Sequence, residues 1–223
     1  MKRLIVIPVI HTLADLGSLA DSVRDYYVAH FGPAVWQQRQ GAVKGLWNDI
    51  RRAIEALHLD FRHVRIYQDG LPVCGVGFPQ GNRMEEQIVR ELAGAGSLNH
   101  QLVLELVGNG AVLTGTEDPQ LLIREYQLQR SQMDATGVCG EGSRVERRES
   151  RGAPTLNSQP STLNPSVVSE AADILAARDR FITQRITATL QEGETGLLFL
   201  GAAHRIDTLS LEGIDTVTLD RAG

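Results

Sequence analysis

Short runs that are typical of strands, the first of them apolar and rich in β-branched residues, alternate along this chain with longer stretches of helical periodicity. The runs lie at residues 4–10, 63–70, 110–119, 197–200 and 213–220. Between them apolar residues recur every three or four positions, as in an amphipathic helix. Strands separated in this way by helices favour a parallel sheet, because parallel strands need long crossover connections. The sequence therefore predicts an α/β fold, with a mostly parallel sheet flanked by helices.

The helical stretches are bounded by capping and breaking residues. They are expected at residues 18–30, 33–59, 82–94, 97–107, 119–132 and 167–191. Residues 33–59 read as one long amphipathic helix, with a break near Gly41 or Gly45 as the alternative. Ser18 and Asn82 are the expected N-caps of the first and third helices.

The chain of 223 residues suits a single α/β domain over residues 1–223, with one insertion inside it. The insertion, residues 139–166, has no apolar periodicity and contains the near-repeat TLNSQPS and TLNPS. Such a segment buries too little apolar surface to offset the entropy lost on ordering. It is therefore expected to be a flexible, low-complexity insertion within the domain.

Charge and composition exclude several classes of partner. The net charge is −5 and the isoelectric point is about 5.7, so neither nucleic acid nor an anionic membrane is an expected partner. The apolar runs all fall short of the roughly 18 residues that a membrane helix needs. Cys74 and Cys139 lack the spacing of a zinc site. These features predict a cytoplasmic protein.

Ionisable residues follow the predicted strands. His11 comes after the first strand, Asp69 ends the second, Glu117 ends the third and His204 follows the fourth. The carboxyl ends of parallel strands share one edge of the sheet, where such folds bind ligands. We therefore expect the two histidines to converge on one cleft, where imidazole could bind a divalent metal or exchange a proton.

The C-terminal part of the chain resembles a known family. The stretch ARDRFITQRITATLQEGETGLLFLGAAHRID contains an Arg-Asp pair at Arg178, followed by a strand and a Gly-x-x-His at residues 201–204. This pattern is similar to the TraB/PrgY family, which includes the Tiki proteases and is related to the EreA/ChaN-like proteins. Asp179 stands where that family tends to have asparagine. In place of the family's first Gly-x-x-His the chain has PVIH, which keeps His11 and lacks the glycine.

The resemblance implies a metal-dependent, peptidase-like hydrolase acting on a small molecule or a peptide. His11 and His204 would hold a divalent metal ion that activates water. Glu117 or Glu86 would be the family's glutamate, acting as a ligand or general base. Arg178 would bind or polarise the substrate.

A binding protein of the same fold is the alternative. It would hold a metal, haem or a small ligand through the histidines without turnover. A base placed beside the ion would distinguish the enzyme from the binding protein. Glu85, next to Glu86, also competes for the position of the family's glutamate.

Arg178 admits two interpretations. It could form a surface ion pair with Asp173, Asp179 or Glu170, which would stabilise the fold by about 0–1 kcal/mol. It could instead direct its guanidinium into the cleft and hold a carbonyl group, a carboxylate or the glutamate beside the histidines through its planar fork of donors. We favour the second, because the pattern of Arg-Asp followed by Gly-x-x-His is the strongest family-like feature of the chain.

Overall fold

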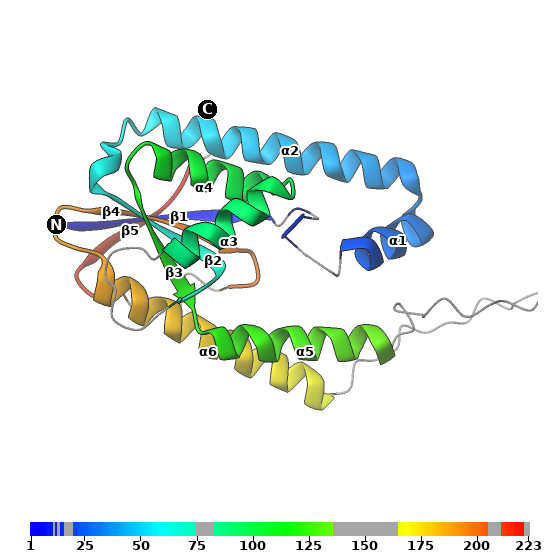
Figure 1. Ribbon diagram of the computed structural model, residues 1–223. Helices are drawn as coiled ribbons and strands as arrows, with labels where there is room; N and C mark the ends of the chain where they lie inside the picture. Colours follow the sequence, from blue (N-terminus) through cyan, green and yellow to red (C-terminus); the bar gives the residue numbers. More distant parts are fainter. Residues whose placement is uncertain are drawn as a thin grey trace, which may run out of the picture.

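The fold is a parallel sheet with helices on both faces. A computed structural model of the chain describes residues 1–10, 12, 14–15, 20–74, 83–135, 165–204 and 211–220 (Figure 1). Across these residues the strands form one all-parallel sheet in the order β3-β2-β4-β1-β5. The strands are β1 (Lys2–Val9), β2 (Val64–Pro72), β3 (Val112–Glu117), β4 (Thr195–Gly201) and β5 (Ile214–Thr218). The α/β fold class predicted from the sequence is confirmed.

The helices also follow the predicted pattern. They are α1 (Ala20–Phe31), α2 (Pro33–Ala56), α3 (Arg83–Gly94), α4 (Leu98–Gly108), α5 (Pro119–Ala135) and α6 (Pro165–Thr189), with a short 3₁₀ turn, η2 (Phe61–His63), before β2. Helix α2 runs unbroken through Gly41 and Gly45, so the alternative of a break there is wrong. None of the described helices is both long enough and apolar enough to cross a bilayer.

Several expectations concern residues outside the described ranges. The expected caps at Ser18 and Asn82 lie there, as does most of the insertion expected over 139–166. Helix α6 begins at Pro165, so the last two residues of that expected segment are helical.

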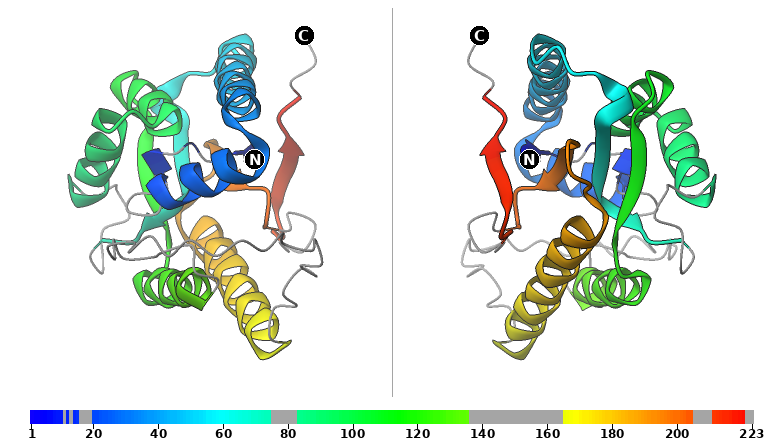
Figure 2. Two further views of the ribbon diagram at one scale, coloured as in Figure 1. Left: turned by 90° about the vertical axis from the view of Figure 1, so that its right-hand side faces the viewer. Right: turned by 90° about the vertical axis from the view of Figure 1, so that its left-hand side faces the viewer.

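Two hydrophobic cores hold the layers together, one on each face of the sheet. Helices α2, α3 and α4 cover one face and α5 and α6 lie on the other (Figures 1 and 2). Trp47 and Ile50 of α2 pack with Phe199 of β4 in the first core. Ile182 and Ile186 of α6 pack with other strand residues in the second core. Strand residues buried on both faces explain why the strands read as continuous apolar runs.

The strand order determines where a ligand site is expected. After β2 the chain continues to β3, toward one edge of the sheet. After β4 it continues to β5, toward the opposite edge. Strands β2 and β4 are neighbours, so their outgoing connections diverge at this point. Open α/β sheets bind ligands at such a divergence, outside the carboxyl ends of the strands.

The ladder between β2 and β3 is interrupted close to this point. Its register shifts between Gln68 and Pro72, and Gly70 within the interruption has a φ of 78°, which glycine adopts without strain. The buried carboxylate of Glu85 enters here from α3 and accepts hydrogen bonds from the backbone N–H groups of Gly115 at 3.1 Å and Cys74 at 3.2 Å. Glu85 therefore ties α3 to the ends of both strands.

Candidate metal centre

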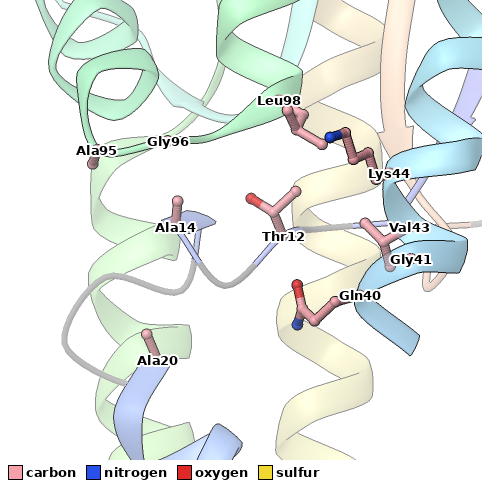
Figure 3. Close-up of a pocket in the computed structure, with 10 residues that line it drawn as sticks. All are labelled: Thr12, Ala14, Ala20, Gln40, Gly41, Val43, Lys44, Ala95, Gly96 and Leu98. Atoms are coloured by element: carbon pink, nitrogen blue, oxygen red, sulfur yellow. The ribbon is translucent and has the colours of Figure 1, made fainter. Parts of the chain in front are cut away.

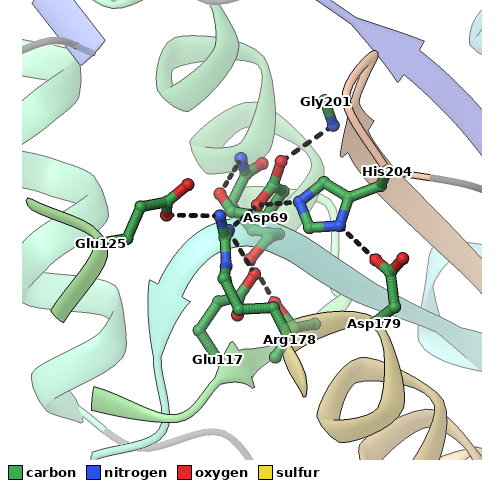
Figure 4. A network of polar contacts seen from close by, with 9 residues as sticks. Asp69, Glu117, Glu125, Arg178, Asp179, Gly201 and His204 are labelled. Atoms are coloured by element: carbon green, nitrogen blue, oxygen red, sulfur yellow. Dashed lines mark hydrogen bonds and ion pairs between the residues drawn. The ribbon is translucent and has the colours of Figure 1, made fainter. Parts of the chain in front are cut away.

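Two carboxylates and an imidazole meet at the carboxyl end of the sheet (Figure 4). Asp69 comes from β2, Glu117 from the end of β3 and His204 from the segment after β4. One potential ligand atom of each residue lies within 4.8 Å of the other two, and all three residues are buried. The arrangement has the composition of a divalent metal site.

The guanidinium of Arg178 reaches this group from α6. It meets Glu117 through two bonds, Nε to Oε2 at 3.1 Å and Nη2 to Oε1 at 2.7 Å. The same Nη2 lies 2.6 Å from Oδ1 of Asp69, and Nη1 lies 2.6 Å from Oε2 of Glu125 on α5. One buried cation therefore holds together three carboxylates from β2, β3 and α5.

His204 is positioned by a tight turn and by two carboxylates. Its backbone N–H donates to the carbonyl of Gly201 at 3.1 Å, which closes the turn after β4. Its Nδ1 lies 2.5 Å from Oδ1 of Asp179, and its Nε2 lies 3.4 Å from Oδ1 of Asp69. A carboxylate on one ring nitrogen orients the other toward a ligand, as in many metal-binding histidines. The N–H of Gly201 also donates to Oδ2 of Asp69 at 2.8 Å.

The shared environment shifts the pKa values of these groups. Burial raises the pKa of Glu117 to about 7, although the bonds from Arg178 act against the shift. Burial lowers the pKa of His204, but the contacts with Asp69 and Asp179 outweigh it and raise the pKa to about 9. Glu117 therefore titrates close to neutral pH, where a proton-transfer group is most useful, whereas the raised pKa keeps His204 protonated there.

The stability of the fold should depend on pH through His204. Its pKa rises from 6.5 to about 9 on folding, so its stabilisation is complete below pH 6.5 and is lost as the pH rises through 9. The raised pKa of Glu117 acts in the same direction, between about pH 4.5 and 7. Urea unfolding of the wild type should show a decrease on the order of 2–3 kcal/mol between neutral pH and pH 9.

The variants His204→Gln and His30→Gln separate this effect from other titrations. His204→Gln should flatten the decrease above neutral pH, whereas His30→Gln on the exposed face of α1 should preserve it. An undiminished decrease in His204→Gln would assign the effect to another group.

The structure brings together three of the site residues predicted from the sequence, namely Glu117, Arg178 and His204. Glu86 lies elsewhere, half-exposed on α3 and paired with Arg90. His11 lies outside the described residues, so its expected convergence with His204 stays a prediction.

The structure agrees with the favoured interpretation of Arg178, in which its guanidinium is directed into the site. It is buried and its fork holds Glu117, and its ion pairs are with Asp69, Glu117 and Glu125 rather than with the three surface candidates. Its catalytic role stays a prediction.

Three residues of the network were not assigned to the site from the sequence. The sequence identifies Asp69 only as the end of a strand, because Arg65 and Gln68 make the same stretch polar and its charge does not stand out. For Asp179 the sequence indicates only a place in the family pattern and a surface ion pair with Arg178. Glu125 lies in the second turn of α5, where a carboxylate is typical of an exposed helix face, so its pattern carried no signal.

A second buried polar group contains a serine, a histidine and an aspartate, but it lacks the geometry of a catalytic triad. Oγ of Ser97 and Oδ1 of Asp15 both contact the same ring nitrogen, Nδ1 of His100, at 2.8 and 3.1 Å. A catalytic histidine uses one ring nitrogen for the nucleophile and the other for the acid. Ser97 is also the N-cap of α4, accepting from the N–H of His100. The group therefore fastens the segment after β1 to the start of α4.

A pocket of about 700 Å³ opens beside this group (Figure 3). Its polar lining is Thr12 together with Gln40 and Lys44 of α2, and small residues such as Gly41 and Gly96 widen it. Its walls are mainly apolar side chains and backbone. The pocket could take a small organic ligand.

Comparison of the chain with family models, with curated proteins and with solved structures finds no match. The resemblance to the TraB/PrgY family therefore stays a prediction based on Arg178 and the Gly-x-x-His at residues 201–204.

Proposed function

We propose that the protein is a metal-dependent hydrolase in which Asp69, Glu117 and His204 hold a divalent ion. The observation that carries the proposal is the convergence of their ligand atoms within 4.8 Å of one another in a buried setting. The ligand set expected from the sequence was His11 and His204. In the proposed set the carboxylates of Asp69 and Glu117 take the place of His11. The resemblance to the TraB/PrgY family belongs to the same proposal.

The residues present suit such an ion. Two carboxylate oxygens and one imidazole nitrogen form a donor set accepted by several divalent metals. Asp179 on Nδ1 of His204 directs Nε2 toward the carboxylates, which is the usual outer contact of a metal-binding histidine. Burial of all three side chains keeps competing water away from them.

The chemistry of hydrolysis would be shared between the ion and the protein. A divalent ion lowers the pKa of bound water and polarises a carbonyl group. Arg178 has a planar fork of donors suited to a carbonyl or a carboxylate of a small molecule or peptide. Asp179 would keep the ring of His204 in one orientation throughout.

Metal binding tests the proposed ligand set. Asp69→Asn, Glu117→Gln and His204→Ala should each weaken the binding of Zn²⁺ or Mn²⁺ by about 100-fold or more, since loss of a ligand exceeds the effect of losing an outer contact. Glu86→Gln on α3 removes a carboxylate away from the site and should bind like the wild type. Elemental analysis after equilibrium dialysis measures the bound ion.

Hydrolysis of ester and peptide panels, with and without the added ion, then separates an enzyme from a binding protein. Equal ion content in the wild type and the three ligand variants would contradict the proposed centre. Ion binding without hydrolysis of any panel member would leave the centre in place and favour the non-catalytic function.

A non-catalytic binding protein is the second candidate, and one observation favours it. The carboxylates of the candidate centre are already bound by Arg178, while the separate pocket beside Thr12 and Lys44 offers room for a small ligand. In that case the ion pairs of Arg178 with Asp69 and Glu117 would stabilise the fold, and the ligand would bind in the pocket.

A further inference from the structure

We infer that Arg178 is a resident cation of the candidate centre, and that Glu125 holds its guanidinium aside when a divalent ion binds. The inference rests on the proposed function, because it concerns the same carboxylates. Glu125 does not bind the ion in this inference. It is a positioning residue that holds Arg178 so that the ion has room.

The metal ion and the guanidinium would compete for the same oxygens. Both oxygens of Glu117 accept from Arg178, and Nη2 lies 2.6 Å from Oδ1 of Asp69 and 2.7 Å from Oε1 of Glu117. Divalent transition metals bind carboxylate oxygen at about 2.0–2.2 Å. An ion between these two oxygens would therefore lie where Nη2 now lies. The like charges of ion and guanidinium also exclude close approach.

Glu125 is placed to receive the displaced group. Its Oε2 already lies 2.6 Å from Nη1 of Arg178. It belongs to α5, and its side chain is 28 % exposed, whereas those of Asp69 and Glu117 are 4 % and 0 % exposed. Arg178 lies inside the long helix α6. Rotation of its side chain toward α5 would therefore free the two ligands without moving the backbone.

The held guanidinium would keep a use in the proposed reaction. With Nη1 bound to Glu125, Nε and Nη2 would be released from Glu117 and Asp69. These donors form one edge of the fork and could meet a carbonyl or carboxylate group. Glu125 would thus link ion binding to the exposure of a substrate-binding group.

Calorimetric titration with Mn²⁺ tests the inference in the intact chain. Glu125→Gln should weaken Mn²⁺ binding about tenfold. Without the ion, Asp69 and Glu117 still hold the guanidinium of this variant, but with the ion bound the displaced guanidinium has lost its charged acceptor. Glu170→Gln is the matched control, since it removes an equivalent carboxylate from α6 that pairs with Arg124 and not with Arg178. It should change the affinity less than about twofold.

A double-mutant cycle separates this role from simple attraction between Glu125 and the ion. Arg178→Gln should bind Mn²⁺ more tightly than the wild type, and in that background Glu125→Gln should have little further effect. Equal weakening by Glu125→Gln in both backgrounds would overturn the inference and leave the metal centre standing. Absence of Mn²⁺ binding in every variant would overturn both.

A second measurement needs no change at Arg178. The ¹⁵N resonance of its Nε–H group should shift on saturation with Zn²⁺ in the wild type, because the bond to Glu117 is lost. Binding of Zn²⁺ with an unchanged resonance would show that the guanidinium stays on the ligands, and the inference would be wrong.

Discussion

Arg178→Met is expected to lower the free energy of unfolding by about 3–5 kcal/mol. The substitution keeps an unbranched side chain of helical preference in α6 but leaves Asp69 and Glu117 buried without their cation. A buried carboxylate that loses its partner must be protonated or solvated, and either event favours the unfolded chain. Urea denaturation at neutral pH measures the loss.

Two further variants establish the origin of that loss. Arg124→Met removes an arginine of α5 whose side chain is 58 % exposed and pairs with Glu170, so it should cost no more than about 1 kcal/mol. Arg178→Met combined with Glu117→Gln should recover part of the lost free energy of unfolding, since one of the two unpaired buried carboxylates is then neutral. A loss below about 1 kcal/mol for Arg178→Met alone would show that the carboxylates do not depend on this guanidinium.

Gly115→Ala is expected to cost about 3 kcal/mol or more, at the upper end of overpacking effects. A Cβ atom at this position would lie 2.5 Å from the carbonyl oxygen of Pro72 and 2.7 Å from Oε1 of Glu85. The first neighbour is backbone and the second is a buried carboxylate that holds two backbone N–H groups. Neither can withdraw without breaking the junction of β2 and β3.

Glycines of α2 supply the contrast. A Cβ added at Gly41 or Gly45 would meet no atom within 4 Å. Alanine at either position should stabilise the protein by about 0.5–1 kcal/mol through its higher helix propensity. Thermal unfolding of the three single variants compares them directly. A Gly115→Ala variant as stable as the wild type would contradict the close packing of Pro72 and Glu85 against Gly115.

Much of the fold could be predicted because the sheet is buried on both faces. Residues such as Ile5, Val6 and Phe199 lie between two layers of helices, so their strands are uniformly apolar and easily recognised. The strand order could not be predicted, because residues 136–164 separate α5 from α6 and periodicity carries no information on which strands pair.

Glu117 and His204 could be predicted from their places at strand ends and Arg178 from the family-like pattern, whereas Glu125 could not be predicted. Glu117 and His204 come at the ends of apolar strands, and parallel strands bring such ends together. Glu125 depends on the rotation of α5 about its own axis and on the crossing of α5 with α6. These are tertiary features, so a lone glutamate in a polar helical stretch reads as an exposed residue.

The place of β1 between β4 and β5 has a consequence for how the chain folds during synthesis. Strand β1 pairs Arg3 with Thr195 of β4 and Lys2 with Ile214 of β5. This apolar strand is therefore made before the other four strands of the sheet, yet both of its hydrogen-bonding neighbours are the last two of the five to be made. Strands β2 and β3 are close in sequence and can assemble earlier with α3 and α4. Until β4 and β5 have been made, the segment LIVIPV keeps two open edges, and such edges favour aggregation and slow the final closure of the sheet.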